Sequence, residues 1–139
     1  MKRVRIYRVS APPSAFAPLL EAACAAGLRV GWLSICEPEP PAPLSAAIVS
    51  GATRTAMAGE RLTLTARRRR GPAVLEDLLR REFAGCRVVL VDGEVEAPHL
   101  QPVPEGGWSI TGPAGEELAA DPSRLVAIWQ RPKGTRKRG

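Results

Sequence analysis

The first 35 residues contain a β-type run, a helical run and a second β-type run, in that order. Residues 4–9 are β-branched and aromatic with partial alternation, which predicts a strand. Apolar residues then recur at helical spacing over residues 15–26, with Ser14 as the candidate N-cap and Gly27 as the stop. The near-continuous apolar run at residues 28–35 is typical of a strand covered on both faces. This order predicts a βαβ unit in an α/β fold, with a mostly parallel β-sheet flanked by helices.

The alternation of strand and helix patterns continues after residue 36. Residues 37–43 contain four prolines, which remove hydrogen-bond donors, so an exposed loop is expected there. The remaining patterns predict a helix over residues 45–58 interrupted by Gly51, a strand over 60–66, a helix from Pro72 to a stop at Gly85, a strand over 86–91, and a short last strand over 125–129.

The length of 139 residues allows one hydrophobic core but not two ordinary domains. We expect a single α/β domain over residues 1–129 and a basic, disordered tail over residues 130–139. No window of about 18 consecutive apolar residues occurs, so neither a membrane span nor a signal peptide is expected. Cys24, Cys36 and Cys86 are odd in number and widely spaced, which favours buried thiols in a reducing compartment. These features predict a cytoplasmic protein without a metal site.

The basic character of the chain is unevenly distributed. The formal charge is +6, and residues 129–139 carry five basic and no acidic side chains. The run Arg67-Arg68-Arg69-Arg70 joins a predicted strand to a predicted helix. It is a candidate contact for nucleic acid, for a cofactor pyrophosphate or for an acidic partner; the alternative is a solvated, mutually repelling connection. The tail lacks interleaved aromatic residues for base stacking, so it predicts only weak nonspecific polyanion binding.

Four segments of the chain, taken in order, carry a family likeness. They are Gly27 to Gly31, Ser50 to Gly59, Val89 to Gly93 followed by Ala97 to Leu100, and Ala120 to Ile128. With them the chain resembles the MobB family, the GTP-binding adaptors of molybdopterin-guanine dinucleotide biosynthesis. The resemblance implies a P-loop NTPase-like three-layer sandwich and a homodimer in which edge strands pair. Family members bind GTP with Mg²⁺ and hydrolyse it weakly.

The chain departs from the family at the loop after the first strand. A phosphate-binding loop, G-x-x-x-x-G-K-[ST], needs glycines whose backbone N–H groups converge on phosphate, a lysine for the β- and γ-phosphates, and a hydroxyl for Mg²⁺. Arg8 and Pro13 stand at the two glycine positions. Ser14 stands at the lysine position and Ala15 at the hydroxyl position. Prolines also lack N–H donors. The degenerate nucleotide-binding position comprises Arg8, Ser10, Pro12, Pro13, Ser14 and Ala15.

Few charged groups remain beside this loop. Where the family has a Lys-His-Asp-type sequence after the second strand, this chain has Ser34-Ile35-Cys36. Asp92 and Glu94 form a candidate residual acidic site, and together with Glu96 they would share one face if the strand continued. The alternative is a solvated loop. One carboxylate does not hold Mg²⁺ when phosphates are not anchored, so neither GTP nor a metal is expected as a cofactor.

Two further residue types are candidates for function or packing. His99 is the only histidine, and it lies in a proline-flanked loop with no serine or cysteine partner implied nearby, which favours a structural or solvent-facing role. Trp32, Trp108 and Trp129 lie in or beside predicted strands, so packing in the core or in an interface is their expected use.

The sequence favours a non-catalytic MobB-like accessory protein in molybdenum cofactor biosynthesis or insertion, with GTP binding and hydrolysis lost. The resemblance implies molybdopterin guanylyltransferase or a molybdoenzyme apoprotein as a partner. The alternative is a small basic module that binds nucleic acid or another polyanion. An enzyme that uses the Asp92 region ranks last, because the sequence assembles no nucleophile or base there.

Overall fold

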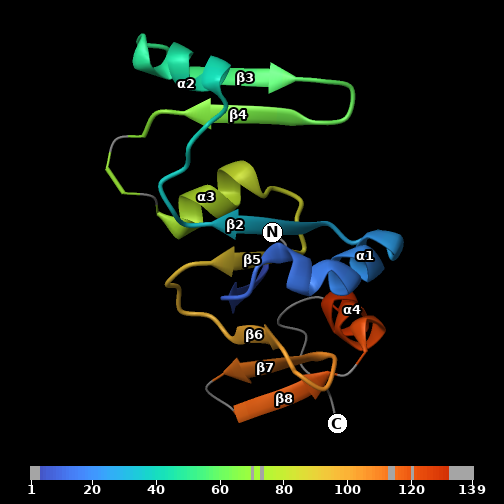
Figure 1. Cartoon of the computed structure of the whole chain (residues 1–139). Coiled ribbons are helices and arrows are strands. Elements are labelled where there is room, and N and C mark those ends of the chain that lie inside the picture. Colours follow the sequence, from blue (N-terminus) through green and yellow to red (C-terminus); the bar gives the residue numbers. More distant parts are fainter. Residues whose placement is uncertain (1–3, 70, 73, 113–114, 120, 132–139) are drawn as a thin grey trace. The chain divides into compact units, whose positions relative to one another are not determined.

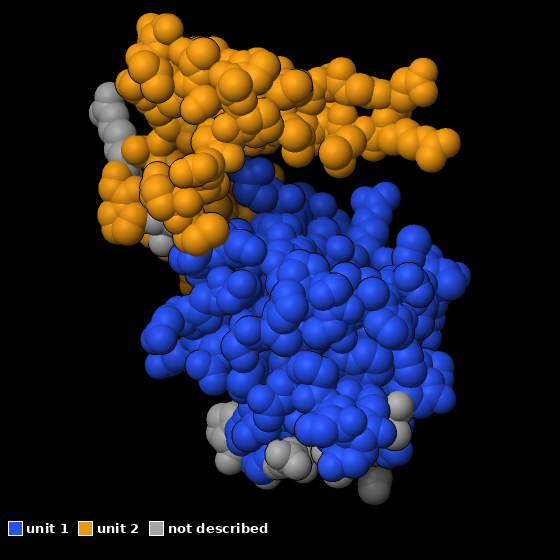
Figure 2. Space-filling view, viewed as in Figure 1, with its two compact units in different colours: residues 1–35, 82–139 blue, residues 36–81 orange. Residues whose placement is uncertain are grey.

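The structure, a computed structural model, describes residues 4–69, 71–72, 74–112, 115–119 and 121–131, with the side chains of residues 116–119 left out. The chain divides into two compact units, residues 1–35 with 82–139 and residues 36–81 (Figure 2). The sequence predicts one domain over residues 1–129; the structure adds that the segment 36–81 makes its own compact unit.

A mixed sheet forms the framework of the first unit (Figure 1). Among the described residues its order is β2-β5-β1-β6-β7-β8, with β2, β5, β1 and β6 parallel and β6, β7 and β8 antiparallel. The strands are β1 (Arg5–Val9), β2 (Val30–Ser34), β5 (Val88–Asp92), β6 (His99–Pro102), β7 (Trp108–Gly112) and β8 (Gly115–Ala119). The predicted α/β class with a mostly parallel sheet is confirmed.

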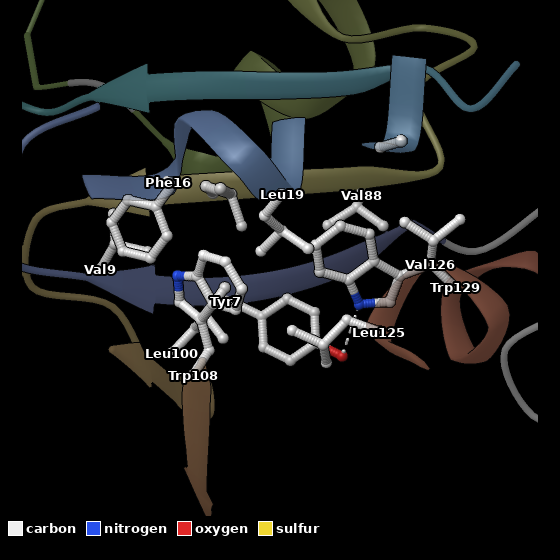
Figure 3. Close-up of a cluster of buried hydrophobic side chains, with 12 residues drawn as sticks. Tyr7, Val9, Phe16, Leu19, Val88, Leu100, Trp108, Leu125, Val126 and Trp129 are labelled. Atoms are coloured by element: carbon white, nitrogen blue, oxygen red, sulfur yellow. Dashed lines mark hydrogen bonds between the residues drawn. The ribbon is translucent and has the colours of Figure 1, made fainter. Parts of the chain in front are cut away.

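The helices α1 (Ala17–Ala25) and α4 (Pro122–Gln130) contact one another and cover one face of this sheet, with the short 3₁₀ helix η1 (Pro13–Phe16) leading into α1 (Figure 3). The core between them contains Tyr7, Val9, Phe16, Leu19, Ala23, Val88, Leu90, Leu100, Trp108, Leu125, Val126 and Trp129. Gly27, at φ 77°, ends the first helix in the left-handed conformation that glycine favours. Val89 and Val91 are also fully buried, as expected for a strand that is apolar on both faces.

The second unit contains a β-hairpin and a helix that packs against it. Helix α2 (Ala42–Val49) contacts both β3 (Arg54–Ala58) and β4 (Thr63–Arg67), which pair antiparallel. The turn between the strands is closed by a hydrogen bond from Gly59 N to Leu62 O, at 2.9 Å. Helix α3 (Leu75–Glu82) begins in this unit, and its last residue, Glu82, belongs to the first unit.

Three predictions of secondary structure are wrong. Residues 125–129 form part of α4 and not a strand, because Asp121 caps the helix by accepting a hydrogen bond from Ser123 N at 2.9 Å. The predicted helix over residues 45–58 is divided: α2 ends before Gly51, which has φ 114°, and β3 follows. Helix α2 also starts at Ala42, inside the predicted proline loop, since proline is compatible with the first helical turn.

The other predicted elements occur close to their expected positions. Helix α1 and strands β1, β2, β4 and β5 match their predictions, and α3 occupies the centre of the helix expected between Pro72 and Gly85. Strands β6, β7 and β8 have no counterpart in the sequence predictions. The predicted tail is described only at Gln130, the last residue of α4, and at Arg131; residues 132–139 lie outside the described residues.

The prediction that the cysteines are buried is wrong. Cys24 and Cys36 are exposed, and Cys86 is half-buried. All three are free thiols. Cys24 follows the buried Ala23 along α1 and therefore turns out of the core, whereas Cys36 lies just after β2 ends. In the part of the chain that the structure describes, no helix is long and apolar enough to cross a membrane.

Candidate functional site

The carboxyl ends of three parallel strands and the start of a fourth meet at one edge of the sheet. Val9 of β1 lies in register with Asp92 of β5, and Asp92 lies in register with Ser34 of β2. Arg8 of β1 lies in register with His99, the first residue of β6. Ligands of open α/β sheets bind beyond this edge, so these residues and the loop from β1 to α1 form the candidate site.

The β1–α1 loop lies where a phosphate-binding loop would be expected. Arg8 is part of β1, and its backbone N–H donates to Pro98 O at 2.9 Å. Pro12 and Pro13 have no N–H, and Ala15 N–H donates to Pro12 O at 3.0 Å within the 3₁₀ turn. Ser14 is exposed. At Arg8, Pro12, Pro13 and Ala15, therefore, the backbone N–H is either absent or bonded within the protein backbone.

Ser10 and His99 are brought together across the edge of the sheet. Ser10 Oγ lies 2.9 Å from His99 Nε2, although the two residues are 89 positions apart in the chain. Burial, and secondly the positive charge of Arg8, lower the pKa of His99 below its ordinary value of 6.5. The expectation that His99 has no serine partner is wrong. Only the pairing of β1 with β6 reveals the contact, and no local sequence signal indicates it.

The acidic residues of the predicted site are exposed, and only Asp92 lies within a strand. Strand β5 ends at Asp92 and the chain bends over residues 93–94, so Glu94 and Glu96 do not continue the alternation of the strand. Asp92, Glu94 and Glu96 are exposed. Among the described residues, no three His, Cys, Asp or Glu side chains are grouped so that they could hold a metal ion. The strand does not continue past Asp92, so the condition for a shared face is not met, and the exposed positions of Glu94 and Glu96 agree with the alternative of a solvated loop.

Ser34, which lies in register with Asp92 on β2, uses its hydroxyl in a contact within the protein. Ser34 Oγ accepts a hydrogen bond from Trp32 Nε1 at 3.0 Å. Trp32 in turn packs against Phe16, with ring centroids 5.7 Å apart. Trp108 and Trp129 are buried in the core, so packing is confirmed as the use of these two residues.

The arginine run belongs to the second unit. Arg67 ends β4 and lies in register with Arg54 of β3, and Arg68 N–H donates to Thr53 O at 3.1 Å. Arg68 and Arg69 are exposed, and Arg70 lies outside the described residues. The described part of the run therefore extends the end of a hairpin strand.

Solved structures provide a match for this architecture. A crystal structure of Bacillus subtilis MobB matches with a TM-score of 0.50 and 21% sequence identity, over 68% of this chain and 64% of the matched chain. The chain has a MobB-like fold. A second structure of Bacillus subtilis MobB matches with a TM-score of 0.49, 20% identity and coverage of 70% and 61%. A MobB homologue from Bacillus stearothermophilus matches with a TM-score of 0.40, 26% identity and coverage of 68% and 58%.

The match covers only part of the MobB chain. The aligned part of the chain spans 64% of the length of the first Bacillus subtilis MobB structure. No protein-family model matches the sequence, and a search of curated proteins gives no match. The likeness to MobB therefore concerns the fold.

Proposed function

We propose that the protein is a non-catalytic, MobB-like accessory protein of molybdenum cofactor biosynthesis or insertion that neither binds nor hydrolyses GTP. The MobB-like fold supports the biological context. The observation that carries the loss of GTP is the β1–α1 loop, in which Pro12 and Pro13 supply no N–H and Ala15 N–H is bonded to Pro12 O. A phosphate cradle depends on several converging backbone N–H groups. In this loop Pro12 and Pro13 have no N–H, and the N–H groups of Arg8 and Ala15 are bonded within the backbone.

A titration with a fluorescent GTP analogue and Mg²⁺ tests the loss directly. We expect no saturable binding at micromolar protein, whereas a P-loop GTP-binding protein run in parallel should saturate. The variant Ser14→Lys restores the lysine position without restoring any N–H donor, and it should also fail to bind. Saturable binding by the natural chain, or its gain through Ser14→Lys alone, would show that the cradle is intact.

The proposed partners are molybdopterin guanylyltransferase or a molybdoenzyme apoprotein. Capture of either purified partner on the immobilised chain, with an unrelated protein of similar basic charge as the control, tests this part. Retention of neither partner under low-salt conditions would remove the molybdenum context and leave only the fold.

We also propose that the protein acts as a homodimer in which the β3–β4 hairpin of one copy pairs with that of another. Among the described residues β3 and β4 pair only with each other, which leaves both outer edges of this sheet open. Met57 and Leu64 lie in register on the hairpin and are 40% and 41% exposed. Leu62, in the turn, is 67% exposed. Open strand edges beside exposed apolar side chains favour pairing with a second copy.

A polyanion-binding role is the second candidate function. Arg54 and Arg67 lie in register on the hairpin, and Arg68 and Arg69 continue the positive charge along the chain. Binding to arbitrary duplex DNA that weakens steeply with salt would support this role, because phosphate contacts release counterions. The variant Arg68→Gln/Arg69→Gln should lose most of that binding; its retention would point away from the hairpin.

A further inference from the structure

A cluster of one charged and two polar side chains lies on the sheet face opposite α1. Tyr7 and Val9 point into the α1–α4 core, so by alternation Arg8 and the following Ser10 project from the other face. His99 lies in register with Arg8, and its neighbour Leu100 points into the core, which places His99 on the same face as Arg8. The later part of the β1–α1 loop, from Pro12 onward, leads to α1 on the other face of the sheet.

From this cluster we propose that Arg8, Ser10 and His99 form a binding site for a small oxyanion. The proposal goes beyond the accessory function. The site shares Arg8 and Ser10 with the degenerate nucleotide-binding position, but it adds His99 of β6 and takes a small anion instead of a nucleotide. The three groups supply a guanidinium, a hydroxyl and an imidazole, which are the donors that oxyanions take in proteins.

The backbone holds these donors in place. Arg8 is fixed within β1 by the parallel ladder to β5 and by the bond from its own N–H to Pro98 O. The hydrogen bond between Ser10 Oγ and His99 Nε2, at 2.9 Å, fixes the hydroxyl and the ring relative to one another. Arg8 and His99 are half-buried and Ser10 is exposed, so the cluster is anchored on one side and open to solvent on the other.

The charges near the cluster leave the guanidinium available. Within the described parts of the chain, Arg8 makes no ion pair and no side-chain hydrogen bond. Asp92 lies in register with Val9, so it belongs to the face of the sheet that carries α1. Glu94 and Glu96 are exposed in the connection before β6. Thr111, the residue opposite His99 on β7, carries no charge. The positive charge of Arg8 therefore faces His99 without a neutralising carboxylate.

Anion binding and protonation of His99 should be coupled. In the unliganded protein, burial and the charge of Arg8 disfavour the imidazolium and lower the pKa of His99. A bound oxyanion would neutralise Arg8 and favour the imidazolium. Once protonated, His99 donates Nε2–H to Ser10 Oγ, and the Ser10 hydroxyl hydrogen becomes free to bond the anion. The anion should therefore bind more tightly to the protonated form.

The single histidine makes this coupling directly measurable. We would follow the ring Cε1–H signal of His99 by NMR in the full chain, as a function of pH, with inorganic phosphate or with chloride at the same ionic strength. Saturating phosphate should raise the pKa of His99 by about one unit, which corresponds to roughly tenfold tighter binding by the protonated form. Acetate in place of phosphate distinguishes a carboxylate site from a phosphoryl site, because only the preferred anion should give the full rise.

Three variants and one further measurement complete the test. Arg8→Gln should raise the starting pKa of His99 and abolish its response to phosphate, while Arg124→Gln, an exposed position on α4, should change neither. Ser10→Ala should weaken the response. Should Arg8→Gln fail to fold, saturable phosphate-induced shifts of the Arg8 and Ser10 backbone amides in the natural chain decide the matter. A His99 pKa indifferent to phosphate, or a response that survives in Arg8→Gln, would overturn the site without affecting the GTP result.

Discussion

Trp129 Nε1 donates a hydrogen bond to the Tyr7 hydroxyl at 3.1 Å inside the core, and their rings lie 5.8 Å apart (Figure 3). This contact connects the last helix to the first strand across 122 positions of the chain. Both residues are almost completely buried, so water cannot replace either partner. The bond therefore fastens α4 to the sheet on the same face that carries α1.

The variant Tyr7→Phe removes the acceptor while keeping the ring. It leaves the buried Trp129 N–H unsatisfied, which should lower the free energy of unfolding by about 1–3 kcal/mol, measured by urea denaturation. Ser34→Ala is the matched control, because it removes the acceptor of a similar indole–hydroxyl bond at an exposed position. The control should cost less than about 0.5 kcal/mol. Equal losses in the two variants would contradict the importance of burial.

Arg87 should stabilise the carboxyl end of α4. Its Nε donates to Trp129 O at 3.0 Å and its Nη2 to Gln130 O at 2.6 Å. These bonds satisfy terminal helix carbonyls and place a positive charge at the negative end of the helix dipole. Arg87→Gln should therefore lower the free energy of unfolding by about 1.5 kcal/mol. Arg124→Gln, on the exposed side of the same helix, should stay within about 0.5 kcal/mol of the natural chain, and a similar loss there would argue against a specific cap.

Stability should depend on pH through His99. Because its folded pKa lies below the ordinary value of 6.5, the unfolded chain binds more protons in the interval between the two values. The free energy of unfolding should therefore fall as the pH is lowered from about 6.5 through the folded pKa, and level off below it. His99→Asn should flatten this interval, and Arg8→Gln should flatten it in part, because burial is the larger cause and remains.

The carboxyl of Asp121 provides a separate signal at lower pH. Hydrogen bonds from the backbone and hydroxyl of Ser123 hold the pKa of Asp121 below 3.8. The contribution of Asp121 to the free energy of unfolding is therefore lost only in more acidic solution than that in which His99 titrates. If the free energy of unfolding of His99→Asn changes with pH near pH 6 as steeply as that of the natural chain, the assignment of this interval to the histidine is contradicted.

The sequence predicts the parts of this fold that depend on local pattern. Four consecutive buried residues, Val88 to Val91, make β5 recognisable, because a strand covered on both faces needs apolar residues throughout. Residues 125–129 read as a strand by composition, and what makes them helical is the Asp121 cap together with burial of Leu125 and Trp129 on one helix face. A single chain shows the cap residue but not the surface that the helix will cover.

The candidate site, like the fold, could be predicted only where it depends on a local sequence pattern. The replacement of the glycines, lysine and hydroxyl of the P-loop motif can be read residue by residue, since the motif is local. The contact between Ser10 and His99 depends on β6 lying beside β1, and the sequence predictions contain no β6. Long-range strand pairing is set by the whole sheet, so a side-chain pair that depends on it cannot be inferred from spacing alone.

Oligomeric state provides the last prediction, which concerns the hairpin of the second unit. If two copies pair through their hairpins, Met57→Glu/Leu64→Glu should shift the chain from dimer to monomer in size-exclusion chromatography with light scattering, because charges would be buried among apolar side chains. Thr63→Glu is the control: Thr63 neighbours Leu64 in sequence and so points to the opposite side of the hairpin. It should leave the dimer intact. A natural chain that is monomeric at the highest concentration tested, or dissociation caused equally by Thr63→Glu, would contradict hairpin pairing through the Met57–Leu64 side.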